Sequence, residues 1–172
     1  MEFRFSPIGV VHTPHELPEK TPIQPRYAQG VKGQVEVFAE YEEGLADIEG
    51  FSHVVLVYVF DRATPHRLTV VPYLSDTPRG VFATRAPSRP NDIGISVVRL
   101  VGRRGNVLDV EDVDILDGTP LLDIKPYVAR FESNEDVRSG WQDDVDEERA
   151  RTRGRRGFRG GPGGASNADG EV

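Results

Sequence analysis

The sequence predicts an all-β domain, a sandwich or a barrel, rather than a series of strand–helix units. Between residues 3 and 128, short apolar segments alternate with clusters of turn-forming residues. Val35 and Val37 alternate with polar neighbours, which is typical of a strand that is buried on one face. The chain has 172 residues, enough for one domain and a tail.

Eight segments are expected to form strands, because each one holds apolar or β-branched residues between turn residues. In chain order they cover residues 5–11, 34–38, 53–60, 68–71, 80–84, 95–101, 107–113 and 121–124. Residues 54–60 are apolar on both faces, so we place this strand centrally.

Two further elements interrupt the strands. A short helix is expected over residues 40–48, ended by Gly50. Residues 14–33 contain several prolines and little periodicity, which predicts a long loop. Loops of this length in compact domains are usually functional or disordered.

The composition changes after Tyr127. Charge dominates residues 132–156, and residues 153–170 read RGRRGFRGGPGGASNADG, which cannot build a core. We therefore expect the folded domain over residues 1–140 and a charged, then Arg/Gly-rich, disordered tail over residues 141–172. Five arginines between Arg151 and Arg159 would add RNA affinity, and the alternative is a solvated terminus without a binding role.

Composition excludes several classes of protein. The chain has no cysteine, which excludes a disulfide scaffold, a cysteine-ligated zinc site and a thiol nucleophile. No apolar run reaches the about 18 residues of a membrane span, and the first residues do not resemble a secretory signal, so a cytoplasmic location is expected. Residues 1–150 hold 16 Lys and Arg against 26 Asp and Glu, an acidic balance that disfavours a broad, non-specific contact with nucleic-acid phosphates.

Residues 80–96, GVFATRAPSRPNDIGIS, are the first candidate for a site. Pro87 and Pro90 stiffen this loop, which presents Arg85 and Arg89. Guanidinium groups on a rigid loop suit a carboxylate or phosphate. The alternative is that both arginines pair with surface acids.

A second candidate lies at residues 114–127, where three aspartates and one lysine flank a short strand. Asp117-Gly118 also has a simpler interpretation as a turn in which Asp117 bonds its own backbone. His53, at the start of the buried strand, is interpreted as structural rather than catalytic. His12, His15, His53 and His66 lack metal-ligand spacing, so no metal site is expected.

Four blocks of sequence carry a resemblance to a known family. They are IGVVHTP at residues 8–14, GLADIEGFSHVVLVYVFD at 44–61, GVFATRAPSRPNDIGIS at 80–96 and DILDGTPLLDIKPYV at 114–128. Their order and spacing resemble those of the TsaA-like family, also called TrmO. This family methylates N6-threonylcarbamoyladenosine at position 37 of tRNA, beside the anticodon. The resemblance covers about residues 3–130.

The resemblance implies an antiparallel β-barrel unlike the Rossmann methyltransferases, a homodimer, and S-adenosyl-L-methionine bound close to the dimer interface. Carried over motif by motif, the family's cofactor contacts fall on three loops and one turn. The corresponding residues are Gln24, Pro25, Arg26, Asp61, Arg62, Arg85, Asp114, Asp117 and Gly118. The mouth of a barrel could bring these positions together.

The same resemblance suggests roles for individual residues in methyl transfer. Asp117 or Asp114 would accept the proton of the target nitrogen, with Asp117 preferred. Substrate contacts would come from a second group of residues, in which arginine meets the threonyl carboxylate or a phosphate, lysine meets a phosphate and an aromatic ring stacks on a flipped base. This group comprises Arg85 or Arg89, Asn91, Lys125, and Tyr27 or Phe82. For either aromatic residue the alternative is ordinary packing.

Three departures from the family pattern stand out. Asp92 replaces the usual proline, and Asp61-Arg62 replaces the His-Gln pair of bacterial members. An Arg/Gly-rich stretch stands where the bacterial enzymes carry a further domain. A non-catalytic nucleotide- or RNA-binding module of the same fold is therefore the alternative function.

Overall fold

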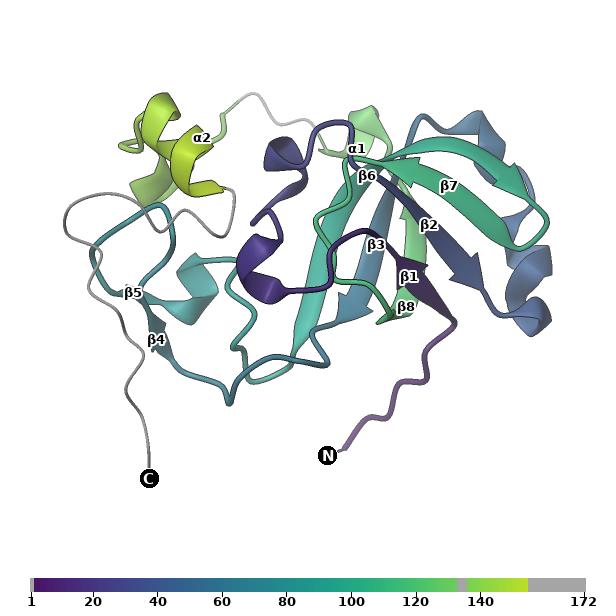
Figure 1. Ribbon diagram of the computed structural model, residues 1–172, viewed down its shortest axis with the longest axis horizontal. Coiled ribbons are helices and arrows are strands. Elements are labelled where there is room, and N and C mark those ends of the chain that lie inside the picture. Colours follow the sequence, from purple (N-terminus) through teal and green to yellow (C-terminus); the bar gives the residue numbers. More distant parts are fainter. Residues whose placement is uncertain (1, 133–135, 155–172) are drawn as a thin grey trace.

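Six strands close into an antiparallel barrel in the computed structural model, which describes residues 2–132 and 136–154 (Figure 1). Around the barrel the order is β1-β2-β7-β6-β3-β8, and β8 pairs with β1 to complete the circle. The strands are β1 (Gly9–His12), β2 (Lys32–Val37), β3 (His53–Val59), β6 (Ile93–Arg104), β7 (Val107–Glu111) and β8 (Thr119–Pro126). The prediction of an all-β fold with an antiparallel barrel is confirmed.

The barrel interior is filled by residues that alternate along each strand. Val35 and Val37 of β2 are buried whereas Gln34 and Glu36 are exposed, as the alternation in the sequence predicts. Leu56 of β3 and Leu108 of β7 are completely buried in the same core. On the outer face of β3, Val55 is buried and Val57 and Val59 are half-buried, which agrees with the apolar residues on both faces of segment 54–60.

Some elements differ from the sequence prediction. The segment expected to be a helix forms two 3₁₀ helices, η3 (Ala39–Leu45) and η4 (Ile48–Gly50). Only Leu45 and Ile48 of these helices are buried, so the segment covers the barrel end with little packing to stabilise a longer α-helix. β1 begins at Gly9, later than expected, whereas β6 extends on both sides of the expected strand.

Residues 80–84 do not form the expected strand. A two-residue strand, β5 (Arg79–Gly80), pairs with β4 (Thr69–Val70), and the chain then turns into η5 (Val81–Ala83). The hydroxyl of Thr84 donates to the Val81 carbonyl at 2.8 Å, and the backbone N–H of Thr84 donates to the same oxygen at 3.1 Å. These local bonds satisfy the backbone without a partner strand.

The long loop of residues 14–33 contains two short 3₁₀ helices, η1 (Pro18–Lys20) and η2 (Pro25–Tyr27). A proline begins each of them, where its fixed φ is favourable and its missing N–H is not needed. The prolines therefore shape this loop rather than merely prevent regular structure.

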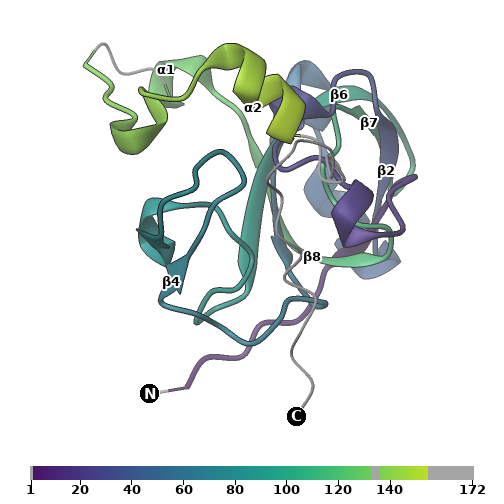
Figure 2. The same cartoon turned by 60° about the vertical axis from the view of Figure 1, so that its left-hand side comes forward.

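The C-terminal segment forms α1 (Ala129–Glu132), η6 (Gly140–Gln142) and α2 (Glu147–Gly154). Two of these elements lie beyond the boundary expected at residue 140. In Figure 1 α2 lies on the side of the β4–β5 segment, and in Figure 2 it lies across the top of the molecule, between this segment and the barrel. The remainder of the expected tail, residues 155–172, lies outside the described residues. Among the helices of the described part, none is long and apolar enough to cross a membrane.

Candidate functional site

Three loops emerge at one mouth of the barrel, because consecutive antiparallel strands place their connections alternately at its two ends. Register shows which ends meet: Lys32 pairs with Glu111, Val59 with Ile93, and Val11 with Thr119. Residues 13–31, 60–92 and 112–118 are therefore the connections at this mouth. They contain all the candidate site residues except Lys125.

Lys125 lies elsewhere. It is six residues beyond Thr119 along β8 and opposite Val55, which places it about 20 Å from the mouth at the usual rise per residue. Its ammonium group pairs with Asp123 at 2.7 Å. Lys125 is close to Asp117 in the sequence, but the length of β8 separates the two residues in space. The structure therefore does not group Lys125 with the other candidates.

Arg85 and Gln24 join two of the mouth loops. The guanidinium of Arg85 donates to the side-chain oxygen of Gln24 at 2.8 Å. Gln24 precedes η2, which begins with Pro25, and its amide nitrogen donates to the Ile23 carbonyl at 2.8 Å. The pair offers a cation and an amide to an anionic or polar ligand. Arg26, within η2, donates from its guanidinium to the Glu147 carboxylate at 3.2 Å.

Arg89 contributes to the structure of its own loop. Its Nη1 donates to the carbonyls of Thr84 at 2.9 Å and Val81 at 3.2 Å, and its guanidinium carbon lies 5.7 Å from the centre of the Phe82 ring. Neither Arg89 nor Arg85 is in a salt bridge with any acid that the structure describes. Because Arg89 already donates to backbone carbonyls, Arg85 is the better candidate to bind an anionic ligand. The carbonyl of Asn91 accepts from Ile93 N–H at 2.7 Å, at the start of β6.

Arg62 connects the second loop to the third. Its guanidinium donates to the carbonyl of Asp117 and lies 3.7 Å from the Asp61 carboxylate. Gly118 follows with φ of +77°, a conformation that favours glycine, and a Cβ there would lie 3.3 Å from the Arg62 guanidinium. The Asp117-Gly118 turn predicted from the sequence is thus held by a residue about 55 positions earlier.

The two candidate aspartates occupy different environments. Asp114 is buried in the 112–118 connection, where its carboxylate accepts a 2.6 Å hydrogen bond from Ser96 of β6, whose hydroxyl also lies 3.1 Å from that of Tyr58. The Asp117 side chain is 49% exposed and accepts a 3.0 Å hydrogen bond from the backbone of Thr13. Of the two, Asp117 is the one that a ligand can reach.

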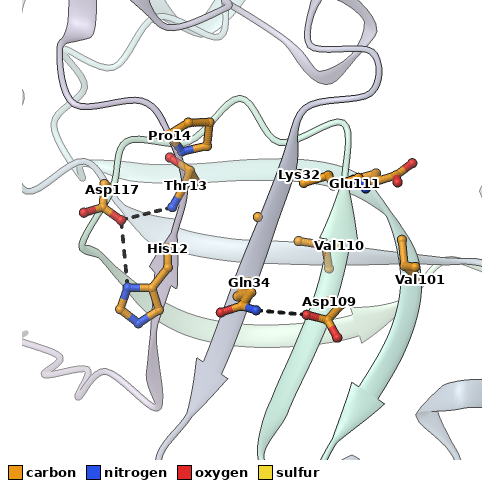
Figure 3. Close-up of a pocket in the computed structure, with 11 residues that line it drawn as sticks. His12, Thr13, Pro14, Lys32, Gln34, Val101, Asp109, Val110, Glu111 and Asp117 are labelled. Atoms are coloured by element: carbon orange, nitrogen blue, oxygen red, sulfur yellow. Dashed lines mark hydrogen bonds and ion pairs between the residues drawn. The ribbon is translucent and has the colours of Figure 1, made fainter.

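Asp117 borders a groove of about 580 Å³ on the outer face of β1, β2 and β7 (Figure 3). His12 lies beside it, with Nδ1 3.8 Å from the Asp117 carboxylate and Nε2 3.1 Å from Glu36. On the far side of the groove, a hydrogen bond from Arg104 holds the pKa of Asp109 below its ordinary value, and a smaller contribution comes from Gln34. A carboxylate held in this way is a weak base, so Asp109 is a poor proton acceptor.

His12 lines this groove, whereas from the sequence it was considered only as a metal ligand. The available signal was its place in the block IGVVHTP, directly before the long loop. Within the described part of the chain, no three His, Asp or Glu side chains are grouped so as to hold a metal ion.

The two aromatic candidates also differ. A Cβ on Gly154 would lie 2.5 Å from Cγ of Tyr27, so α2 covers the ring of Tyr27 closely. Phe82 is 74% exposed. Phe82 is therefore more accessible to a stacking base than Tyr27.

Comparison with known proteins identifies the family. The model for the tRNA-methyltransferase O N-terminal domain matches residues 10–133. A probable S-adenosyl-L-methionine-binding protein of Pyrococcus abyssi is 59% identical over 137 residues, which are 80% of this chain and 74% of that protein. The tRNA (adenine(37)-N6)-methyltransferase of Escherichia coli is 36% identical over 149 residues, which cover 81% of this chain and 63% of that enzyme.

Solved structures agree. A crystal structure of TrmO superposes with a TM-score of 0.71 at 41% identity, and the match covers 81% of this chain and 64% of that one. The structure of TrmO from Pseudomonas aeruginosa gives a TM-score of 0.69 at 38% identity, with 82% and 63% covered. This chain spans somewhat less than two thirds of these structures. On the matching domain and the shared barrel, the chain belongs to the tRNA-methyltransferase O family.

Proposed function

We propose that this protein transfers the methyl group of S-adenosyl-L-methionine to N6 of N6-threonylcarbamoyladenosine at position 37 of tRNA. The family to which the chain belongs comprises S-adenosyl-L-methionine-dependent methyltransferases that act on tRNA adenine. The observation that carries the proposal is the single barrel mouth, which gathers the Arg85–Gln24 pair and the open carboxylate of Asp117.

The residues at the mouth fit the chemical groups of the cofactor. S-adenosyl-L-methionine has a carboxylate, an ammonium group and ribose hydroxyls. Arg85 and Gln24 would hold the carboxylate, and Asp61 would meet the ammonium group or a hydroxyl. When bound, the cofactor supplies the methyl group that leaves its sulfur with the bonding electrons remaining on sulfur.

Asp117 acts as the general base in this reaction. The lone pair of N6 is delocalised into the purine and the carbamoyl group, so the nitrogen is a poor nucleophile until its proton is removed. The carboxylate of Asp117 accepts that proton as the new N–C bond forms. Thr13 and the Arg62–Asp117 backbone contact fix the orientation of this carboxylate.

Carbamoylation of the base makes the reaction easier in two ways. It renders the N6 proton more acidic, and it adds a threonyl carboxylate that Arg89 can bind through guanidinium N–H groups other than Nη1, which donates to backbone carbonyls. On unmodified adenosine the arginine would remain without its anion, and sites reject analogues that leave such groups unpaired. Methylation is therefore expected to require prior threonylcarbamoylation.

The test compares two anticodon stem-loops that differ only in the threonylcarbamoyl group. Transfer of labelled methyl from S-adenosyl-L-methionine is expected on the carbamoylated stem-loop and only at background on the plain one. Equal rates of methyl transfer to both stem-loops would contradict the proposed substrate but not the proposed cofactor. Binding of cofactor and RNA without any transfer would favour the non-catalytic module.

We also propose that the protein is a homodimer. The outer face of β6 exposes Ile93, Ile95 and Val101 to between 42% and 53%, with Arg99 between Ile95 and Val101, and a second copy would cover these apolar residues. Light scattering is expected to give the mass of two chains at micromolar concentration. The mass of one chain, with methyl transfer intact, would contradict this assembly.

A further inference from the structure

The C-terminal segment of residues 140–154 lies outside the matched family domain, which ends at residue 133. Its helix α2 reads EERARTRG, in which five of eight residues are charged, and buries only Ala150 and Gly154. An eight-residue helix of this composition is not stable by itself, so its contacts with the rest of the protein must hold it. These contacts fall on two of the three mouth loops.

The first set of contacts reaches the loop that carries Gln24. The carbonyl of Gly154 accepts a 2.8 Å hydrogen bond from the backbone N–H of Ile23, the residue directly before Gln24. Gly154 is buried against the ring of Tyr27, where no side chain would fit. Glu147 pairs with Arg26 at 3.2 Å. The segment therefore touches the chain on both sides of Gln24.

The second set reaches the loop that carries Arg85. Trp141 donates from its indole nitrogen to the Ala83 carbonyl at 2.8 Å, two residues before Arg85, and the Arg79 guanidinium lies 5.5 Å from the centre of its ring. Arg153 pairs with Asp76 at 2.7 Å, and Arg149 contacts the same carboxylate. Hydrogen bonds from Arg153 and then Arg149 hold the pKa of Asp76 below its ordinary value, so this carboxylate is ionised at neutral pH.

We propose that residues 140–154 form part of the cofactor site, as a brace that holds Gln24 and Arg85 together and thereby sets the affinity for S-adenosyl-L-methionine. The inference rests on the proposed function. The 2.8 Å bond between Arg85 and Gln24 joins two loops, and the brace fixes the backbone of each loop within two residues of that bond. Asp76, Trp141 and Gly154 are positioning residues, because they act through this pair.

A preorganised pair binds its ligand without first losing the freedom of two mobile loops. Without the brace, the ordering cost is added to every binding event, which weakens binding of the cofactor. Once the cofactor is bound, the geometry at Asp117 is unchanged. The Kd and KM for S-adenosyl-L-methionine are therefore expected to rise, while kcat at saturating cofactor is retained.

The brace carries its own reporter, because Trp141 is the only tryptophan in the chain. Asp76→Asn removes the charge that Arg149 and Arg153 share, and Gly154→Val forces the end of α2 away from Tyr27. Each variant is expected to shift the emission of Trp141 to longer wavelength as the indole becomes solvated. Glu49→Gln is the matched control, since it removes an exposed carboxylate paired with Arg103 at 3.5 Å at the opposite end of the barrel.

The experiment measures Trp141 emission and cofactor Kd by calorimetry on the full chain, then places Asp76→Asn in an Arg85→Ala background. Asp76→Asn is expected to weaken binding about tenfold in the native background and less than about twofold once Arg85 is absent, because residues of one network are not additive. A shifted emission with an unchanged Kd would overturn the inference, as would equal effects in both backgrounds. Emission that is unmoved in both variants would show that the brace is not docked and would also overturn it. Failure of the unaltered protein to bind the cofactor would instead contradict the proposed function.

Discussion

Asp117→Asn is expected to lower kcat for methyl transfer by about 100-fold or more, because a positioned general base contributes roughly 10²–10⁴-fold. The amide keeps the size of the side chain and an oxygen that accepts from Thr13 N–H. The substitution removes the negative charge, which also faces His12 at 3.8 Å, and with it the ability to take a proton. Cofactor affinity is therefore expected to change little, and single-turnover transfer at saturating cofactor and RNA measures the chemical step directly.

The matched control for this variant is Asp112→Asn. Asp112 lies in the same loop, and its carboxylate accepts a 2.7 Å hydrogen bond from the backbone of Gly30, which an asparagine oxygen can also accept. Its φ of +66° is one that asparagine tolerates. Asp112→Asn is expected to retain normal kcat. If Asp117→Asn also retained it, proton removal would have to be assigned to another group or to solvent.

Asp114→Ala is expected to destabilise the barrel rather than disable a reactive group. Ser96 is buried, with 1% of the residue exposed, and its hydroxyl donates to the Asp114 carboxylate at 2.6 Å. Leaving a buried donor without its acceptor costs roughly 1–3 kcal/mol. In a domain of this size that lowers Tm by roughly 2–12 °C. Thermal unfolding followed by circular dichroism measures the shift.

A second substitution separates structure from chemistry at this position. Removing the Ser96 and Tyr58 hydroxyls as well, in Asp114→Ala/Ser96→Ala/Tyr58→Phe, is expected to recover part of the lost Tm, since replacing both partners of a buried bond costs less than orphaning one. Loss of methyl transfer by Asp114→Ala at an unchanged Tm would assign Asp114 to the reaction instead.

The positions of the helices and strands followed from the sequence to differing degrees. Alternation at residues 34–37 and the apolar run at 54–60 predicted β2 and β3, because a strand with one buried face repeats every two residues and a strand covered on both sides does not alternate. The strand expected at residues 80–84 was wrong. There the side chains of Thr84 and Arg89 satisfy the carbonyls that a neighbouring strand would otherwise satisfy.

The candidate site, like the strands, could be predicted from the sequence only in part. The sequence marked four separated segments, and the resemblance supplied their shared purpose. Which of their residues are open to a ligand depended on neighbours that no local pattern indicates. Ser96, 18 positions from Asp114, bonds to its carboxylate, whereas Arg89 donates to the backbone of its own loop and Arg85 reaches Gln24 in another loop.

The sequence by itself determined the all-β class, the turn at Asp117-Gly118 and the family, because these depend on local periodicity, turn chemistry and motif order. Only the tertiary structure decided that the barrel closes, that Lys125 is remote from the mouth and that Asp117 rather than Asp114 is accessible. It also shows that residues 140–154, a charged segment expected to be part of a tail, contact both loops, beside Gln24 and Arg85. The physical reason is that register and docking are set by contacts between residues far apart in the chain, and the charged composition of that segment reveals nothing of the partners that hold it.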